Sequence, residues 1–168
     1  GSLASPFVRA ILRDTEGRLW VGTANGLNLL QAEGTFQHYV YRPEDPRGLP
    51  DSFIMSLYQD PSGLLWVGTR SGGVSRWNPR SWQMGHFRPA LANGLPIAAF
   101  AEGRTADETL VGTLGGGLLG VDFSTGAERT LLDTKRGLTD DRVMSLLRDR
   151  QDRLWIGTFT GGLVRQDA

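Results

Sequence analysis

The sequence predicts an all-β fold built from β-propeller blades of four antiparallel strands, and three observations lead to this prediction. Glycine accounts for 23 of the 168 residues, close to twice its average share of about 7%, which favours many tight turns. A Trp-Val-Gly-Thr motif and its flanks recur four times, at spacings of 46, 44 and 45 residues. An alternating stretch of apolar and polar residues precedes every copy of the motif except the third, as in half-buried strands. A period near 45 residues with four strands per unit is typical of a propeller blade.

The repeated motif sets the boundaries of the blades. It is WVGT at 20–23 and 66–69, LVGT at 110–113 and WIGT at 155–158. Because one blade exposes apolar side chains on both faces, it becomes stable only when stacked on neighbours. We expect a single propeller with blade one at 3–48, blade two at 49–94, blade three at 95–137 and blade four at 138–168.

Each unit is expected to contain four strands, named A to D in chain order. In the second unit these are 53–59, 64–70, 74–78 and 82–88. An Asp-x-x-Gly turn joins strands A and B, because Asp accepts backbone N–H groups and Gly adopts the positive φ that closes the turn. Paired glycines reverse the chain between B and C. The third unit has Leu110 in place of Trp and lacks the Asp-x-x-Gly turn, so a less regular blade is expected there.

The fourth unit contains strands A to C but no outer strand, so an incomplete blade is expected. Three arrangements are open. The exposed blade faces could drive self-association of a segment, two copies could close an eight-bladed ring about a two-fold axis, or four blades could close alone. Because unpaired strand edges and exposed apolar faces promote association, we favour a homo-oligomer, such as a dimer that completes a ring.

Composition argues against several functions. The 18 basic and 18 acidic residues leave no formal net charge, whereas a nucleic-acid surface needs clustered basic residues. The absence of cysteine excludes disulfides and thiolate catalysis. No apolar run approaches the roughly 18 residues of a membrane span, and no signal peptide is recognised. Membrane attachment is therefore expected only through segments outside this chain.

No catalytic, cofactor or metal site is predicted. Asp140 and Asp141 are adjacent, and adjacent strand residues point to opposite faces, so they would not converge like glycosidase carboxylates. His38 and His86 fall in outer strands, where no nucleophile or ligand partner is expected. The sequence has no calcium loop of the Asp-x-Asp-x-Asp-Gly type. The chain is therefore expected to be non-catalytic.

The string GLLWVGT at 63–69, followed by GGVSRW at 72–77, resembles the two-component regulator propeller repeat. RLWIGT at 153–158 and GGLVR at 161–165 repeat it, and the resemblance covers essentially the whole chain. It implies a periplasmic sensor propeller, usually seven-bladed, of a bacterial transmembrane receptor. Such receptors carry a histidine kinase or diguanylate cyclase (GGDEF) output, which is absent from these residues. In the best-known members the sensed ligands are oligosaccharides.

Ligand sites of propellers usually lie on one face near the central channel, which here carries the D–A and B–C loops. Loop residues that differ between blades are the best candidates for binding an oligosaccharide or other small polar ligand, since cationic, aromatic and carboxylate groups suit such ligands. They are Asn25, Asp51, Arg70, Ser71, Asp140, Phe159 and Thr160, with Arg47 and Asp141 beside them. Ordinary solvated loops are the alternative interpretation.

Residues that repeat in each blade are expected to be structural instead. The tryptophans should pack within or between blades, and the glycines should serve backbone conformation. These positions are Trp20, Trp66 and Trp155, and Gly22, Gly68, Gly112 and Gly157.

Two functions of different classes are consistent with the sequence. The first is a periplasmic ligand-sensing segment of a signalling receptor. The second is a protein-interaction or dimerisation scaffold without a small ligand. A propeller-based lyase or hydrolase is a third and less favoured alternative.

Overall fold

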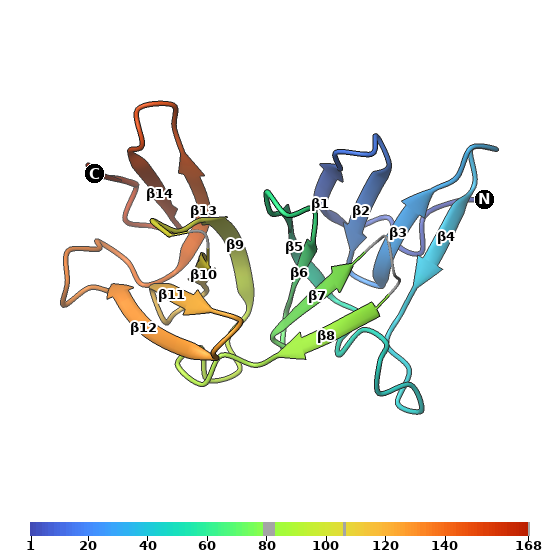
Figure 1. The fold of residues 1–168 in the computed structure, drawn as a ribbon, viewed down its shortest axis with the longest axis horizontal. Helices are drawn as coiled ribbons and strands as arrows, with labels where there is room; N and C mark the ends of the chain where they lie inside the picture. Colours follow the sequence, from blue (N-terminus) through green and yellow to red (C-terminus); the bar gives the residue numbers. More distant parts are fainter. Residues whose placement is uncertain (79–82, 106, 168) are drawn as a thin grey trace. The chain divides into compact units, whose positions relative to one another are not determined.

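The computed structural model describes residues 1–78, 83–105 and 107–167. Within these ranges all regular elements are β-strands, grouped in four antiparallel sheets whose strands follow chain order (Figure 1). This confirms the predicted all-β fold of propeller blades, with four strands in blade three and three in blade four. No helix in the described ranges is long and apolar enough to cross a membrane.

The strands agree with the predicted A-to-D pattern to within a residue or two. Blade one contains β1 (Val8–Arg13), β2 (Leu19–Thr23), β3 (Gly26–Leu30) and β4 (Phe36–Tyr39). Blade two contains β5 (Ile54–Gln59), β6 (Leu65–Thr69), β7 (Val74–Asn78) and β8 (Gln83–Phe87). Blade three contains β9 (Ile97–Glu102), β10 (Glu108–Thr113), β11 (Leu118–Asp122) and β12 (Ala127–Leu132). Blade four contains β13 (Val143–Arg148), β14 (Leu154–Thr158) and β15 (Leu163–Gln166). Position 82, the predicted start of an outer strand, lies outside the described residues.

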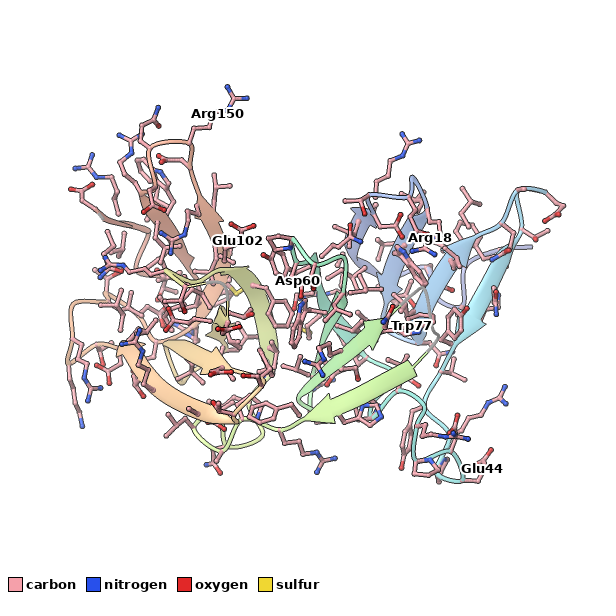
Figure 2. All side chains as sticks on the ribbon, viewed as in Figure 1. Arg18, Glu44, Asp60, Trp77, Glu102 and Arg150 are labelled. Atoms are coloured by element: carbon pink, nitrogen blue, oxygen red, sulfur yellow. The ribbon has the colours of Figure 1, made fainter. Side chains whose placement is uncertain are left out.

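The chain divides into two compact units, Gly1–Phe87 with blades one and two, and Arg88–Ala168 with blades three and four. In the first unit, Trp20 and Leu27 of blade one pack against Ile54 and Trp77 of blade two. Trp77 projects from β7 (Figure 2). The rings of Trp20 and Trp77 meet edge-on, with centroids 4.9 Å apart. Tyr39 packs on the same Trp77 at 4.8 Å, and burial raises the pKa of Tyr39 to about 12. Its phenol therefore stays neutral inside an aromatic cluster.

The second unit has the same kind of interface built from aliphatic side chains. Leu110 and Leu118 of blade three pack with Val143, Leu154 and Ile156 of blade four. Successive strand residues point to opposite faces, so every second residue enters this core. Both units thus bury one face of each of their two blades.

The repeated glycine of the motif makes room for the neighbouring blade. A Cβ at Gly22 would lie 2.6 Å from Cγ2 of Ile54. A Cβ at Gly112 would lie 2.6 Å from Cγ1 of Val143. In each unit, the first residue of the next blade's A strand therefore rests directly on the glycine of the preceding blade.

A second repeated interaction joins the A–B turn to the motif tryptophan, and we call it the Asp–Trp lock. One carboxylate oxygen accepts a backbone N–H group of its own turn, as the sequence predicted. The other oxygen accepts the indole N–H, which the sequence did not predict. The lock joins Asp14 to Trp20, Asp60 to Trp66 and Asp149 to Trp155, each at 2.8 Å.

Arginine reinforces the lock in blades one and four. The guanidinium of Arg18 donates to Asp14 at 2.6 Å, and that of Arg153 donates to Asp149 at 2.7 Å. Burial alone would raise the pKa of Asp14, but hydrogen bonds from Trp20 and Arg18 outweigh it and lower that pKa. For Asp149 the indole of Trp155 is the largest influence, and it holds the pKa well below the usual range. Both carboxyl groups therefore stay ionised.

The motif threonines close the B–C turns. Each hydroxyl donates to the carbonyl of a turn glycine three or four residues later, at 2.8–3.0 Å. The motif threonines therefore satisfy local backbone groups.

Candidate functional site

The predicted ligand residues lie at the ends of the blades that carry the D–A and B–C loops, which we call the loop end. In blade two, Asp51 joins these two loops. Its Oδ2 accepts both the N–H and the hydroxyl of Ser71 at 2.8 Å, and its Oδ1 accepts the N–H of Phe53 at 2.9 Å. The structure thus brings Asp51 and Ser71 together, but their side chains hydrogen-bond to each other.

Blade four repeats this arrangement with different residues. Oδ2 of Asp140 accepts the N–H of Thr160 at 2.8 Å and its hydroxyl at 2.7 Å. The same carboxylate accepts two bonds from the guanidinium of Arg142, at 2.9 and 3.0 Å. Hydrogen bonds from Arg142 and then Thr160 hold the pKa of Asp140 well below its usual range. Asp140 is therefore a fixed anion that joins two loops.

Blade one has a weaker version of the same junction. Ser5 takes the place of the aspartate, and its hydroxyl accepts the N–H of Phe7 at 3.2 Å. Asn25 takes the place of Ser71, and its side chain reaches the carbonyl of Ala4 at 3.4 Å. The loop residues therefore differ between blades while their structural role is shared.

The remaining predicted loop residues have local partners of their own. Asp141 accepts the N–H of Thr134 at 2.6 Å and its hydroxyl at 3.0 Å, so it faces away from the partners of Asp140. Arg47 donates its backbone N–H to Asp45 at 3.1 Å and is exposed. Neither residue joins Asp140 in a common site.

Two arginine–aromatic pairs offer accessible surface at the loop end. In blade two, the guanidinium of Arg70 lies 5.3 Å from the ring of Phe53. In blade four, the guanidinium of Arg142 lies 4.6 Å from the ring of Phe159, which is 60% exposed. In blade two the arginine lies in the B–C loop and the ring in the D–A loop, whereas in blade four the two positions are reversed. Phe53 and Arg142 were not predicted from the sequence, although each stands in the D–A loop opposite a predicted residue of the B–C loop.

Both histidines have hydrogen-bonding partners that the sequence did not predict. Nδ1 of His38 lies 2.6 Å from Oδ1 of Asn28, and Nδ1 of His86 lies 3.1 Å from the hydroxyl of Ser75. Both pairs sit at directly opposed positions of the third and fourth strands. Ser75 is fully buried, whereas a nucleophilic serine must reach its substrate. These pairs therefore tie the outer strand to the blade.

No metal centre is evident in the part of the chain that the structure describes. Its His, Asp and Glu side chains form no group of three or more that could hold an ion.

The successive antiparallel sheets, built on one repeated strand order, place the chain in the class of β-propeller repeat proteins. The family model described as "Two component regulator propeller" matches residues 2–25, 48–71 and 137–160. These segments hold the A and B strands of blades one, two and four, the three blades with the lock. Three segments of this chain are therefore similar to the two-component regulator propeller repeat, which confirms the resemblance predicted from its sequence.

Solved structures show the same fold. The extracellular domain of BT3049 from B. thetaiotaomicron, described as a hybrid two component system, gives a TM-score of 0.83 at 19% identity, over 98% of this chain and 24% of that one. The extracellular domain of BT4673 from the same organism gives 0.79 at 22% identity, over 97% and 22%. The gluconolactonase XC5397 from Xanthomonas campestris gives 0.71 at 17%, over 98% and 60%.

This chain thus spans about a quarter of the length of the two extracellular domains. No curated protein sequence matches it.

The junction in blade four leads to a testable prediction. Replacing Asp140 by alanine removes the acceptor of the Thr160 N–H group. We expect amide hydrogen exchange at Thr160 to accelerate by about tenfold or more, because the freed B–C turn opens locally. Asp141→Ala is the matched control, since Asp141 bonds to Thr134 and not to Thr160. Unchanged exchange at Thr160 in Asp140→Ala would show that Asp140 does not hold the turn.

Proposed function

We propose that this chain is part of the ligand-sensing propeller of a bacterial transmembrane signalling receptor, placed outside the cytoplasm. The observation that carries the proposal is the match of three repeats to the two-component regulator propeller. Similarity of fold to two extracellular domains over 97–98% of the chain supports it. In this proposal the output module, a histidine kinase or a diguanylate cyclase, belongs to the receptor outside these residues.

The loop end supports a sensing role for a polar ligand such as an oligosaccharide. An exposed aromatic ring beside a guanidinium offers a flat apolar surface together with hydrogen-bond donors, as at Phe159 and Arg142. The aspartate junctions hold these loops in place without contributing free carboxylates. A ligand that binds one receptor state more tightly than another would shift the population of the two states.

We further propose that the chain itself is non-catalytic, although proteins of similar fold include enzymes, among them a gluconolactonase and a streptogramin B lyase. The serine that lies beside a histidine is buried. The carboxylate of Asp140 is engaged by Thr160 and Arg142. Neither group is available for acid–base or nucleophilic chemistry in this arrangement.

A membrane-topology experiment on the natural full-length protein tests the receptor proposal. Alkaline phosphatase needs an oxidising compartment to form its disulfides. Joined directly after blade four, it should be active, and joined after the output module it should be inactive. Activity of a cytoplasmic reporter such as β-galactosidase at the blade-four junction would contradict the proposal.

A second candidate function, a self-association scaffold, is favoured by apolar side chains exposed on both end blades. Ile11 of blade one is 65% exposed, and in blade four Leu147 and Leu163 are 62% and 65% exposed. Leu163 pairs with the motif glycine as do Leu27 and Leu118, which are both fully buried. These faces are therefore of the kind that packs on another blade.

We expect the 168-residue chain alone to self-associate, with a homodimer as the favoured product. Light scattering after gel filtration should give a mass above that of one chain. Leu163→Lys should restore the monomer, while Arg165→Lys, on the same strand, should leave the assembly unchanged. A clean monomer for the unaltered chain would contradict the scaffold proposal.

A further inference from the structure

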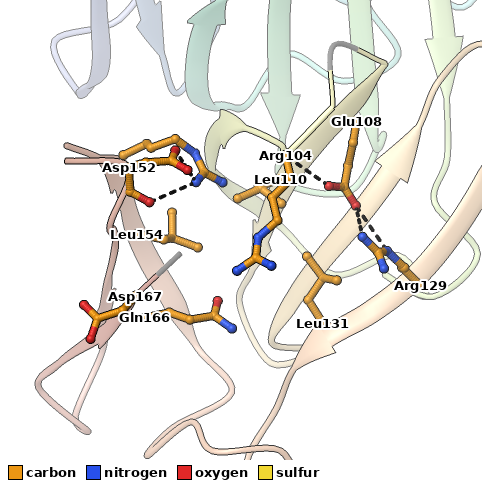
Figure 3. A pocket seen from close by; sticks show the side chains of 10 residues that line it. Arg104, Glu108, Leu110, Arg129, Leu131, Asp152, Leu154, Gln166 and Asp167 are labelled. Atoms are coloured by element: carbon orange, nitrogen blue, oxygen red, sulfur yellow. Dashed lines mark hydrogen bonds and ion pairs between the residues drawn. The ribbon is translucent and has the colours of Figure 1, made fainter. Parts of the chain in front are cut away.

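The second unit contains a cleft of about 150 Å³ between blades three and four, away from the loop end (Figure 3). Its apolar lining comes from Leu110, Leu131 and Leu154. Its polar lining includes Arg104, Glu108 and Gln166. The cleft therefore combines an apolar wall with charged and hydrogen-bonding groups, as small-molecule sites do.

The cleft arises because blade three has lost the Asp–Trp lock. The backbone N–H of Gly103 donates to the carbonyl of Glu108, just as that of Asp14 donates to the carbonyl of Arg18. By this register, Gly103 occupies the place of the aspartate and Glu108 that of the arginine. Leu110 stands where the other blades have the motif tryptophan. Replacement of the indole by the smaller side chain of Leu110 leaves space.

The facing blade contributes to the same opening. Trp77 is paired with Leu65 across β6 and β7, and Gln166 is paired with Leu154 at the equivalent position of β14 and β15. In the first unit Trp77 fills the interface against Trp20. In the second unit the corresponding residues are Gln166 and Leu110, so this interface is open at its rim.

Arg104 differs from the other arginines near the cleft in its lack of an acidic partner. Arg129 pairs with Glu108 at 2.6 Å, Arg148 pairs with Asp152 at 2.9 Å, and Arg165 pairs with Asp167 at 3.0 Å. The guanidinium of Arg104 has no partner among the described residues, and Figure 3 shows it directed into the cleft. The side-chain amide of Gln166 also has no partner within the described ranges and points to the same space.

We propose that this cleft binds the carboxylate of a small polar molecule, with Arg104 as the anion-binding residue. A guanidinium matches a carboxylate in a two-bond geometry, and Gln166 supplies further donors beside it. A single available guanidinium beside several acidic side chains suits one negative charge better than a doubly charged phosphate. Leu110 and Leu131 would contact the body of the ligand. The proposal concerns this chain's own cleft and does not depend on the receptor that carries it.

Titration of the 168-residue chain with sodium gluconate, followed by NMR, tests the proposal. D-glucitol is the matched neutral probe, because it differs only in carrying an alcohol in place of the carboxylate. We expect saturable shifts of the signals of residues 103–105, 107–110 and Gln166 with gluconate and none with glucitol, at constant ionic strength. Arg104→Gln should weaken gluconate binding by about tenfold or more, since it removes a charge-assisted pair.

Arg150→Gln is the control variant, because Arg150 is an exposed arginine at the β13–β14 turn and does not line the cleft (Figure 2). It should bind gluconate like the unaltered chain. Leu110→Trp should fill the cleft and abolish binding. If Leu110→Trp does not fold, Arg104→Gln still tests the proposal. Equal shifts with glucitol, no saturable shift with gluconate, or unchanged affinity in Arg104→Gln would overturn the proposal. None of these results would alter the membrane topology that tests the receptor proposal.

Discussion

The Asp–Trp lock is the interaction on which blades one, two and four of this protein depend. One carboxylate fixes the A–B turn through backbone N–H groups and orients the largest side chain of the blade through its indole N–H. A buried polar group without its partner costs about 1–3 kcal/mol, so the aspartate and the tryptophan stabilise the blade only together. In the first unit, the oriented Trp20 then meets Trp77 of the next blade at 4.9 Å. Local turn geometry and packing between blades are therefore coupled.

Blade three lacks this coupling and still forms. It keeps four strands and the glycine contact to the next blade, because Gly112 still receives Val143. Without the lock, aliphatic residues hold the interface and its rim opens into a charged cleft. A blade can thus form without the Asp–Trp lock, and the space beside Leu110 forms part of the cleft. At the loop end the residues change between blades but the interaction is kept, since junctions such as Asp140–Thr160 still hold the loops in place.

The blades could be predicted from the sequence because their signals are local and repeated. The period, the alternation and the turn residues of WVGT and Asp-x-x-Gly each act within a few neighbouring residues. The site could be predicted only in part. Asp51 and Ser71 were predicted as ligand residues because they differ between blades. The structure shows that they bond to each other and that Asp140 and Thr160 form the equivalent pair in blade four. The loss of Trp at Leu110 was visible in the sequence. The orientation of Arg104 and of the facing Gln166 was not, since both depend on three-dimensional packing.

The free energy of unfolding in urea of two alanine variants tests the central claim about the lock most directly. Asp14→Ala removes the acceptor of the Trp20 indole and of Arg18, and we expect a loss of about 2 kcal/mol or more. Asp107→Ala removes an exposed acid from the A–B turn of blade three, where no lock is found among the described residues, and should change stability by less than about 0.5 kcal/mol. Equal losses in the two variants would contradict the account, because the carboxylate of Asp14 would then have no special role.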